Sequence, residues 1–393
     1  MSRVVVVGAG PAGIAAAVAC RTLGVAEVVV LEREAVAGGV PRHCDHTGFG
    51  LRDLHRVLRG PAYAARWVER AARGGVDVRT STSVLDGTTS LTTTSPRGVE
   101  TLAADAVLLA TGCRERPRHA RLVPGTRPAG VFTTGALQQL VHLRHARVGR
   151  RAVVVGAEHV SFSAVLTLRE AGCETVAMVT ALPAHQTYAP LAWLAGAPVL
   201  AGARVAEIRG HGRVDAVVLD DGRTLACDTV VFTGDWIPEH ELARRAGLAL
   251  DAGTHGPVVD QHGRTSARGV FAAGNLVHAA ETADVAALGG QAAATAIVAF
   301  LRTGAWPARV PLVCEAPLRW VWPQAIDPDG PPSVAFRLRI ETPARAALAT
   351  VQDGRTLWRG PRRRLVPNRS IGAPPAAIAG LDPRGGPVSW RLA

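Results

Sequence analysis

The segment 42-RHCDHTGFG-50 brings together the side chains best suited to chemistry, His43, Cys44 and His46. An imidazole here could carry protons, and Cys44 could act as a redox thiol if neighbouring His or Arg side chains lower its pKa. The order His-Cys-x-His matches no closed metal site, so no metal is predicted. We take these three residues as candidate catalytic groups. A polar loop that only positions a cofactor or a partner is the alternative.

A glycine-rich turn near the N-terminus predicts a phosphate-binding loop. A run of valines at 4–7 is typical of a buried parallel strand, and the small residues at 12–23 are typical of a helix. Between them, Gly8-x-Gly10-x-x-Gly13 permits a tight turn, a close approach to a pyrophosphate and close helix packing. After a second strand at 27–31, Glu32 can accept hydrogen bonds from a ribose. A turn that binds nothing is the alternative. The expected contacts are Gly8, Gly10, Pro11, Ala12, Gly13, Glu32 and Arg33.

The same plan restarts after residue 150. A strand at 153–155, a helix at about 161–171 and a strand at 175–179 repeat the first unit, and 229-TVVFTGD-235 repeats 106-AVLLATG-112. We interpret this as an internal duplication. The other expected elements are a helix near 60–74, a β-hairpin or meander over 76–105, a short β stretch at 214–227, and a strand, turn and long helix over 270–300.

The phosphate loop of the second unit is altered to Gly156-x-Glu158-x-x-Ser161. Glu158 brings a negative charge to the place of a pyrophosphate, and two anions in contact repel by about 1 to 4 kcal/mol. The next strand ends in Met178-Val179-Thr180, with neither an acid for a ribose nor an Arg for a 2′-phosphate. We expect a retained fold with a lost NAD(P) site, so NAD(P)H is a doubtful ligand. The alternative is that Glu158 turns outward and NADH still binds.

Further motifs resemble those of the two-dinucleotide-binding-domain flavoproteins, the pyridine nucleotide-disulfide oxidoreductase-like superfamily. These motifs are Gly38-Gly39, 110-ATG-112, 270-VFAAGN-275 and 281-ETADVAALGGQAAATA-296. The resemblance implies FAD and an α/β fold with tandem Rossmann-like FAD and NAD(P)-type domains, as in glutathione reductase. Where that superfamily usually has an Asp, this chain has Asn275. The resemblance adds Gly39, Val40, Arg42, Val84, Ala110, Thr111, Gly112, Gly274, Asn275, Glu281 and Thr282 to the expected cofactor contacts. For Glu281 and Thr282, helix capping is the alternative.

Within that superfamily, about residues 1–300 resemble the flavoprotein subunits of multicomponent sarcosine, opine and hydroxyproline dehydrogenases and of hydrogen cyanide synthase. The segments that carry this resemblance are 38–67, 110–118, 124–140 and 234–248. It implies an electron-transferring role on a small-molecule substrate, together with a small 2Fe-2S protein and a second flavoprotein dehydrogenase subunit. No Cys pair follows the Gly38-Gly39 loop, and any iron–sulfur centre is expected on a partner. A self-contained NAD(P)H-dependent flavin oxidoreductase and a non-catalytic scaffold are the alternatives.

Composition adds limits of its own. The 393 residues carry a net charge of +12, all 44 basic residues are Arg, and their scatter argues against nucleic acid. No signal peptide is recognised. The apolar stretch 189–203 is too short and broken for a membrane span. Six scattered Cys residues favour a reducing, cytoplasmic setting. We expect three domains: an FAD domain at 1–118 and 248–305, an NAD(P)-like domain at 119–247, and a β-rich domain at 306–393.

Overall fold

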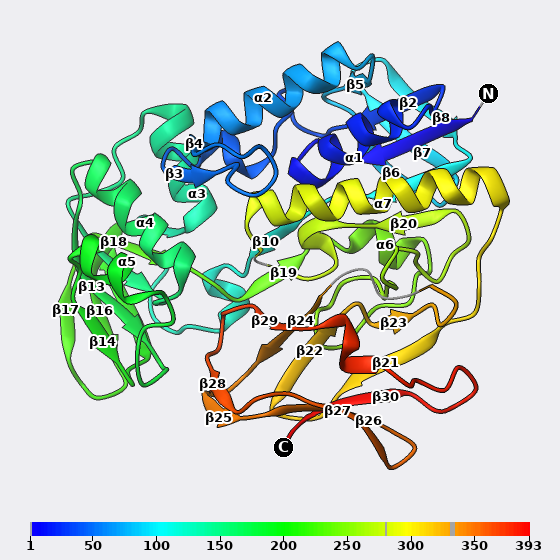
Figure 1. Ribbon diagram of the computed structural model, residues 1–393. Helices are drawn as coiled ribbons and strands as arrows, with labels where there is room; N and C mark the ends of the chain where they lie inside the picture. The colour runs from blue at the N-terminus through cyan, green and yellow to red at the C-terminus, as the bar shows by residue number, and fades with distance from the viewer. Residues whose placement is uncertain (1, 280, 331–334) are drawn as a thin grey trace.

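The computed structural model describes residues 2–279, 281–330 and 335–393. Two parallel sheets with helices occupy most of the chain, and a β-rich region forms the C-terminal part (Figure 1). In Figure 1 the first sheet and its helices lie at the top, the second lies at the left in green, and the C-terminal strands lie below in orange and red. The α/β class with paired nucleotide-type sheets is as predicted.

The first sheet has the strand order β20-β9-β1-β2-β5, and every pairing is parallel. Its strands are β1 (Arg3–Val7), β2 (Glu27–Leu31), β5 (Asp77–Arg79), β9 (Ala106–Leu109) and β20 (Val270–Ala272). Because side chains alternate along a strand, Val4 and Val6 pack under the helices, whereas Val5 and Val7 pack under the meander. The helices are α1 (Pro11–Thr22), α2 (Gly60–Arg73) and α7 (Ala283–Thr303), and the meander is β6 (Ser83–Gly87), β7 (Ser90–Ser95) and β8 (Gly98–Ala103).

The predicted meander over 76–105 needs one correction. Its first strand, β5, is a parallel edge strand of the first sheet and pairs with β2, so the antiparallel meander begins only at β6. Two short strands, β3 (Thr47–Phe49) and β4 (Leu58–Arg59), and the 3-10 turn η1 (Val40–His43) lie between β2 and α2. The candidate catalytic loop is therefore an ordered part of the first region.

The second sheet repeats the plan with the order β11-β18-β12-β13-β14, again parallel. The strands are β11 (Val131–Thr133), β12 (Arg151–Val155), β13 (Glu174–Thr180), β14 (Val199–Ala201) and β18 (Thr229–Phe232). Its helices are α3 (Thr134–Gln138), α4 (His159–Glu170) and α5 (Ala189–Ala195), with a π-helical turn η3 (Gln139–Leu143) after α3. Its meander is β15 (Val205–His211), β16 (Arg213–Leu219) and β17 (Thr224–Ala226). The repeated order agrees with the predicted internal duplication.

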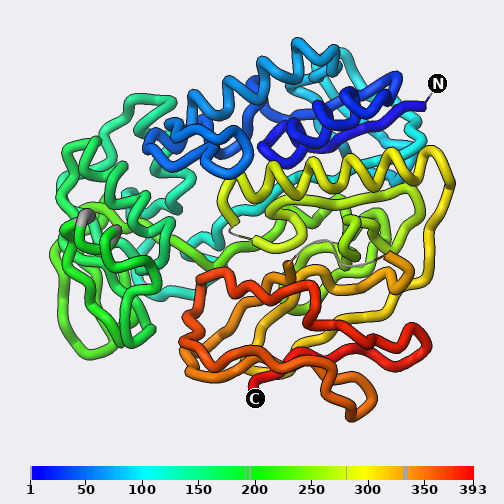
Figure 2. Tube along the Cα trace, viewed as in Figure 1, coloured from blue at the N-terminus to red at the C-terminus, as the bar shows by residue number. Residues whose placement is uncertain are grey.

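Two short strands join the regions. β10 (Cys113–Glu115) leaves the first sheet, and β19 (Trp236–Pro238) returns to it; the two pair antiparallel. The chain then passes through η2 (Arg118–Arg121) on the way out, and through α6 (Glu241–Arg245) on the way back to β20 and the turn η4 (Gly274–Leu276). The predicted boundaries near 118 and 248 fall close to these crossings, and Figure 2 traces the path.

The C-terminal region is built from strands, as expected from its alternating segments. Its main sheet has the order β23-β21-β30-β26-β27, next to the sheets β22-β24-β29 and β25-β28. The predicted strand 388–392 is β30 (Val388–Leu392); the predicted strand 334–340 is β24 (Phe336–Ile340), and its residue 334 lies outside the described residues. The others are β21 (Val310–Cys314), β22 (Leu318–Trp322), β23 (Ala325–Ile326), β25 (Ala344–Ala346), β26 (Leu348–Gln352), β27 (Arg355–Arg359), β28 (Arg363–Leu365) and β29 (Ile371–Ala373), with the turn η5 (Pro375–Ile378).

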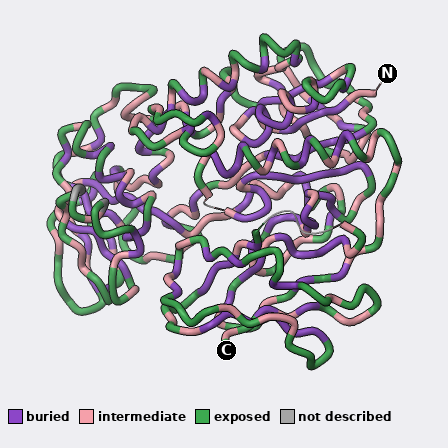
Figure 3. Tube along the Cα trace, in the orientation of Figure 1, coloured by how far each residue is buried: buried purple, intermediate pink, exposed green. Residues whose placement is uncertain are grey.

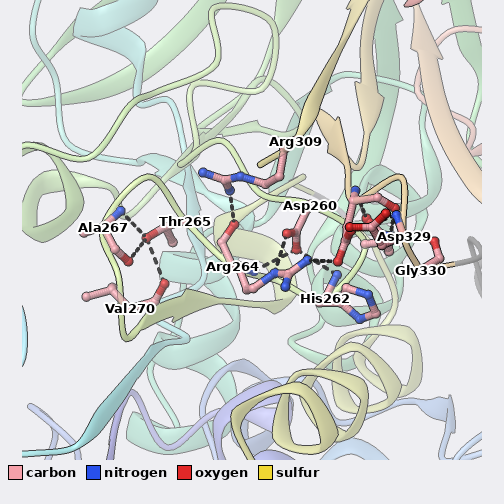
Figure 4. A network of polar contacts seen from close by, with 11 residues as sticks. Asp260, His262, Arg264, Thr265, Ala267, Val270, Arg309, Asp329 and Gly330 are labelled. Atoms are coloured by element: carbon pink, nitrogen blue, oxygen red, sulfur yellow. Dashed lines mark hydrogen bonds and ion pairs between the residues drawn. The ribbon is translucent and has the colours of Figure 1, made fainter. Parts of the chain in front are cut away.

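A buried ionic network attaches the C-terminal region to the first (Figure 4). Arg264 donates to Asp260 at 2.7 Å and to Asp327, just beyond β23, at 2.6 Å. Arg309 donates to the carbonyl of Arg264 at 2.8 Å. Because Asp260, Arg264 and Asp327 are all buried, removing one partner would leave a buried charge uncompensated, at a cost of about 3–5 kcal/mol.

One helix among the described residues, α7, is long and apolar enough to cross a membrane by length and composition. Half of its most apolar window is buried inside the protein, and buried positions alternate with exposed ones along it (Figure 3). It packs against α1 so closely that a Cβ on Gly290 would lie 2.0 Å from the carbonyl oxygen of Ala12. These are the contacts of a core helix.

Candidate flavin site and degenerate nucleotide site

The three glycines of the first phosphate loop have distinct geometric tasks. Gly8 has a φ of +104°, and a Cβ there would lie 2.5 Å from the carbonyl oxygen of Ala110. A Cβ on Gly13 would lie 1.9 Å from the carbonyl oxygen of Gly8. Gly10 differs, because a Cβ there would meet no atom within 4 Å. The open space lies at the N-terminus of α1, where Gly10 provides no side-chain cap and the backbone N–H groups can bind a phosphate.

Glu32 stands at the end of β2 with its carboxylate held in place. It accepts hydrogen bonds from the backbone N–H of Ala9 at 2.8 Å and of Glu34 at 2.9 Å, and it is buried. A carboxylate has about four acceptor positions, so lone pairs remain for ribose hydroxyls. The predicted position and the observed one agree.

The Gly38-Gly39 turn forms the second wall of the phosphate loop. Gly39 has a φ of +65°, and a Cβ on it would lie 2.8 Å from the Cα of Gly10. The backbone N–H of Gly38 donates to the carbonyl of Ala9 at 2.9 Å. Of the nearby side chains predicted to contact the cofactor, Val40 is exposed and Arg42 forms an ion pair with Glu34. Together with the open space at Gly10, these residues fit a bound FAD.

Arg33 and the motif 110–112 lie near Glu239, which directly follows the crossing strand β19. Arg33 lies 3.6 Å from the carboxylate of Glu239. The hydroxyl of Thr111 donates to the carbonyl of Glu239 at 2.8 Å, and the backbone N–H of Glu239 donates to the carbonyl of Gly112 at 2.9 Å. Val84 is partly buried and packs into the core under the meander. The structure thus gives Thr111 and Gly112 a structural role between the two crossings, beside their predicted role toward FAD.

The late motif, residues 270–275, leads into the turn that precedes α7. Gly274 has a φ of +73°, and a Cβ there would lie 2.6 Å from the Cβ of Ala12. The amide of Asn275 accepts from the backbone N–H of Glu281 at 3.1 Å and donates to its carbonyl at 3.2 Å. Thr282 occupies the N-cap position of α7 without a side-chain capping bond. The backbone N–H of Val285 in the first turn instead donates to the carboxylate of Asp284 at 2.9 Å, so an acid of the chain already lies at the positive dipole end of α7.

The side chain of Glu281 is directed to the C-terminal region. Its carboxylate accepts from Arg337 and Arg339, each at 3.2 Å, and both residues belong to β24. A direct contact of this carboxylate with a flavin, one of the two predicted roles, would compete with these ion pairs. Capping by its side chain, the other role, is also not observed, because no side-chain capping bond is present.

The three candidate catalytic residues do not form one cluster. Cys44 is buried, and its thiol donates to Gln138 on α3 at 3.2 Å. Burial, with a smaller effect of the Glu115 charge, raises the pKa of Cys44 to about 12. A redox role was predicted on condition of a lowered pKa, and this condition is not met, because the thiol is buried.

His43 and His46 differ in environment. Burial and the charge of Arg42 lower the pKa of His43 to about 4, so its ring is neutral at neutral pH. Its Nδ1 is buried and has no hydrogen-bond partner among the described residues. His46 is hydrogen-bonded to the carbonyl of Thr47 at 2.9 Å, and its ring centre lies 5.2 Å from that of Phe49, with the two rings tilted by 37°. Of the three, His43 remains the best candidate to meet a bound ligand.

Sequence reasoning did not single out Glu115. It lies buried on β10, and its Oε2 accepts from the backbone N–H of Gly135 at 2.8 Å. Burial raises its pKa to about 7, with the hydrogen bond from Gly135 opposing part of the shift. The sequence gives no signal for this, since Glu115 stands in a polar, Arg-rich stretch typical of a surface loop.

The second phosphate loop is closed by its own side chains. Glu158 is the N-cap of α4, and its carboxylate accepts from the backbone N–H of Val160 at 2.6 Å and from the Ser161 hydroxyl at 2.9 Å. The Ser161 oxygen in turn accepts from the backbone N–H of Glu158 at 3.1 Å and contacts Thr233 at 2.5 Å. Such a reciprocal capping box satisfies the N–H groups that would otherwise bind a phosphate.

Glu158 does not turn outward. It is buried, and burial raises its pKa. The alternative in which its side chain swings away from the loop is therefore not the arrangement observed. A carboxylate of the chain itself occupies the helix N-terminus that a pyrophosphate would need.

Comparison with known proteins agrees with this architecture. The sequence profile of the pyridine nucleotide-disulphide oxidoreductase family matches residues 2–290. The ferredoxin reductase component of a chlorobenzene dioxygenase from Cupriavidus sp. (strain PS12) is 30% identical over 291 residues, which cover 70% of this chain and 67% of that protein. Ferredoxin reductases were not among the relatives that the sequence analysis named.

Two relatives belong to the named group. An opine oxidase subunit from Agrobacterium tumefaciens (strain Ach5) is 26% identical over 339 residues, or 76% of this chain and 65% of that protein. The alpha subunit of sarcosine oxidase from Corynebacterium sp. (strain P-1) is 28% identical over 357 residues, or 81% of this chain and 35% of that protein. The predicted resemblance is thus confirmed. The chain spans between 44% and 67% of the length of the first curated relatives it matches.

Solved structures support the fold. The thioredoxin reductase of T. acidophilum superposes with a TM-score of 0.66 at 23% identity, over 77% of this chain and 100% of that one. The two-sheet architecture, the open first phosphate loop and the family match point the same way. The chain belongs to the pyridine nucleotide-disulphide oxidoreductase family and is an FAD-dependent oxidoreductase.

Proposed function

We propose that this chain is the electron-transferring flavoprotein subunit of a heteromeric dehydrogenase that acts on an amine, an amino acid or a related small molecule. The observation that carries the proposal is the capping box at the second phosphate loop, where Glu158 and Ser161 satisfy the end of α4. With this end closed, electrons reach the flavin from a partner and not from a nicotinamide. The similarity to the opine oxidase and sarcosine oxidase subunits supports this role.

FAD, when bound, accepts and passes on one or two electrons. The chain's own residues would hold its pyrophosphate at Gly10 and α1, and its ribose at Glu32. The neutral ring of His43 can exchange a proton without itself starting as a cation.

The state of the cysteines supports the proposed partners. All six cysteines are free, and Cys44 is a buried thiol with a raised pKa. This argues for an electron path outside the chain, with a small 2Fe-2S protein and a second flavoprotein dehydrogenase subunit as the partners. A reducing, cytoplasmic location belongs to the same proposal.

A second candidate function is a self-contained NAD(P)H-dependent flavin oxidoreductase. It is favoured by a relative named as the ferredoxin–NAD(+) reductase subunit of a benzene 1,2-dioxygenase system in Pseudomonas putida, 30% identical over 226 residues. The two candidates differ in one property, which is whether the loop at Glu158 admits a nicotinamide dinucleotide.

The test measures the dissociation constant of NADH by equilibrium dialysis for the wild type, Glu158→Gly and Glu158→Gln. Removing the side chain should tighten NADH binding by at least about tenfold, since an anion–anion repulsion of about 1 to 4 kcal/mol is lifted. Glu158→Gln is the matched control, because it removes the charge but leaves the loop filled. Tight binding by the wild type, weakened by Glu158→Gly, would favour the second candidate.

A further inference from the structure

Three side chains of metal-binding type meet where the candidate catalytic loop 42–50 reaches the second domain. Asp45 comes from this loop, His142 from the π-helical turn η3, and Glu170 from the end of α4. One possible ligand atom of each lies within 4.8 Å of those of the other two. The turn η1 contacts both α3 and η3, at the upper left of Figure 1. The three residues therefore form one group across two regions of the chain.

His142 is the best-placed ligand of the group. Its side chain is only 9% exposed, and its Nδ1 lies 4.0 Å from a carboxylate oxygen of Glu170. That distance is too long for a hydrogen bond, and Nδ1 forms no hydrogen bond with any other described residue. The Nε2 lies 3.5 Å from the hydroxyl of Thr167, a weak contact. A nearly buried imidazole nitrogen that faces a carboxylate without bonding to it is suited to an ion between the two.

The two acids can move toward a shared ion. The side chain of Glu170 is 49% exposed and that of Asp45 is 32% exposed. The Oδ1 of Asp45 accepts from the Nε of Arg59 at 2.7 Å, whereas its Oδ2 accepts no hydrogen bond from the described residues. Ligand atoms around a tetrahedral zinc ion lie about 3.3–3.6 Å apart, so movements of about 1 Å in these side chains complete the site.

The charges of the group favour a cation. Asp45 and Glu170 contribute two negative charges, and Arg59 contributes one positive charge. The hydrogen bond and the charge of Arg59 lower the pKa of Asp45, so this acid is ionised at neutral pH. A metal-bound imidazole is neutral. The acids thus outnumber the cation, and Arg59 is the group that competes with a metal ion for Asp45.

The donor atoms select the kind of ion. Imidazole suits zinc and other transition metals, whereas Mg²⁺ and Ca²⁺ prefer a shell of oxygen ligands. One nitrogen and two carboxylates are enough for a zinc site that keeps a further position for water. We propose that Asp45, His142 and Glu170 form a binding site for a divalent transition-metal ion, which joins the loop 42–50 to the second domain.

The proposal goes beyond the electron-transfer role and does not depend on which donor reduces the flavin. Its test is a calorimetric titration of the full FAD-loaded chain with ZnCl₂, and with MgCl₂ as the comparison. Zn²⁺ should bind saturably, and Mg²⁺ at least about tenfold more weakly, because the imidazole is a poor ligand for Mg²⁺.

Glu170→Gln should weaken Zn²⁺ binding by at least about tenfold, because a neutral amide replaces a charged ligand. Since Glu170 is half exposed, this change leaves the core undisturbed. Glu174→Gln is the matched control, because Glu174 is an exposed acid of the second domain outside the group, and it should leave binding unchanged. His142→Gln should act as Glu170→Gln does, with the exposed His211 at the end of β15 changed to Gln as its control.

Arg59→Gln separates this site from unspecific binding to surface histidines. The change frees Oδ1 of Asp45 and removes one positive charge, so Zn²⁺ should bind about three- to tenfold more tightly. Arg73→Gln is the control, because Arg73 is an exposed arginine at the other end of α2 and is paired with Glu69. It should leave Zn²⁺ binding unchanged.

Hydrogen exchange tests whether the ion joins the two regions. Zn²⁺ should slow amide exchange in both 44–47 and 139–143 of the wild type, but not of Glu170→Gln, since an ion bound to the folded state opposes local opening. Slowing confined to one of the two segments would contradict the joining role.

The proposal is overturned if Zn²⁺ does not bind saturably, if Mg²⁺ binds equally well, or if Glu170→Gln binds Zn²⁺ as the wild type does. Reduction of the flavin by NADH in the same samples would contradict the proposed function but would leave the Zn²⁺ result to be judged by itself.

Discussion

At the scale of residues, the two phosphate loops show how single side chains decide whether a nucleotide can bind. Gly8 and Gly13 are required by backbone contacts, whereas Gly10 faces open space. In the second loop, the positions of Gly10 and Gly13 are taken by Glu158 and Ser161, which bond to each other. The first motif and the altered residues of the second were both recognised from residue types, because glycine roles depend on local geometry. That NAD(P)H no longer binds at the second loop stays a prediction.

Gly10→Ala separates cofactor binding from folding. Gly10 has a φ of −79°, which any residue can adopt, and the added Cβ meets no protein atom. We therefore expect an unchanged fold and an FAD dissociation constant raised by at least about tenfold, since the methyl group enters the pyrophosphate position.

The measurement is the dissociation constant of FAD, obtained by adding FAD to the apoprotein and monitoring fluorescence. Gly372→Ala is the control, since Gly372 also has open space around its Cβ position but lies on β29, in the C-terminal region. Equal FAD affinity of Gly10→Ala and the wild type would argue against the assigned pyrophosphate site.

Because Glu115 is buried, we expect the free energy of unfolding to depend on pH. Its pKa is about 7 in the folded chain against about 4.5 unfolded, so the folded state retains a proton that the unfolded state has lost. This contribution is fully present below about pH 4.5 and is lost as the pH rises through about 7. Its full size is on the order of 3 kcal/mol.

Glu115→Gln mimics the protonated acid at every pH. The free energy of unfolding of the wild type, measured with urea and compared with that of Glu115→Gln, should fall as the pH rises from 5 to about 8. A constant difference between the two proteins over this range would show that Glu115 is ionised in the fold throughout.

At the scale of elements, most helices and strands were predictable because their patterns are local. The valine runs of β1 and β12 and the small residues of α1 identify the paired units. Contacts between distant elements were not predictable. Cys44 meets Gln138 across 94 positions, and Glu281 meets Arg337 across 56 positions. The environment of the candidate catalytic loop was therefore beyond sequence reasoning, although its place in the chain was not.

Because Arg369 joins the C-terminal region to the second domain, we expect its removal to change hydrogen exchange in the second domain. It bonds to the carbonyls of Gln186 and Thr187 and stacks on Tyr188. Arg369→Ala should speed amide hydrogen exchange in the segment 181–188 by about three- to tenfold, as expected when an interaction of about 1 kcal/mol is lost.

Arg364→Ala is the control for this exchange experiment, because Arg364 is exposed on β28 and no contact of its side chain with the second domain is present among the described residues. If hydrogen exchange in 181–188 is the same in Arg369→Ala and in the wild type, the contacts of Arg369 do not stabilise this segment.

At the scale of the whole molecule, one fold carries a phosphate loop with open space at Gly10 and a second loop capped by Glu158 and Ser161. The C-terminal region is anchored to the first domain through Arg264 and to the second through Arg369, and it covers the cleft that the second domain would use. The family and its cofactor could be predicted from motifs. The position of the C-terminal region over this cleft could not, because no local pattern encodes the contact.

The most direct test of the central claim is an anaerobic titration of the FAD-loaded protein with NADH and NADPH, followed by flavin absorbance. With Glu158 closing the second phosphate loop, neither nucleotide should bleach the flavin within minutes, while dithionite should reduce it fully. Prompt bleaching by NADH or NADPH would contradict the account, because it would show that the second domain delivers electrons from a nicotinamide despite its capped loop.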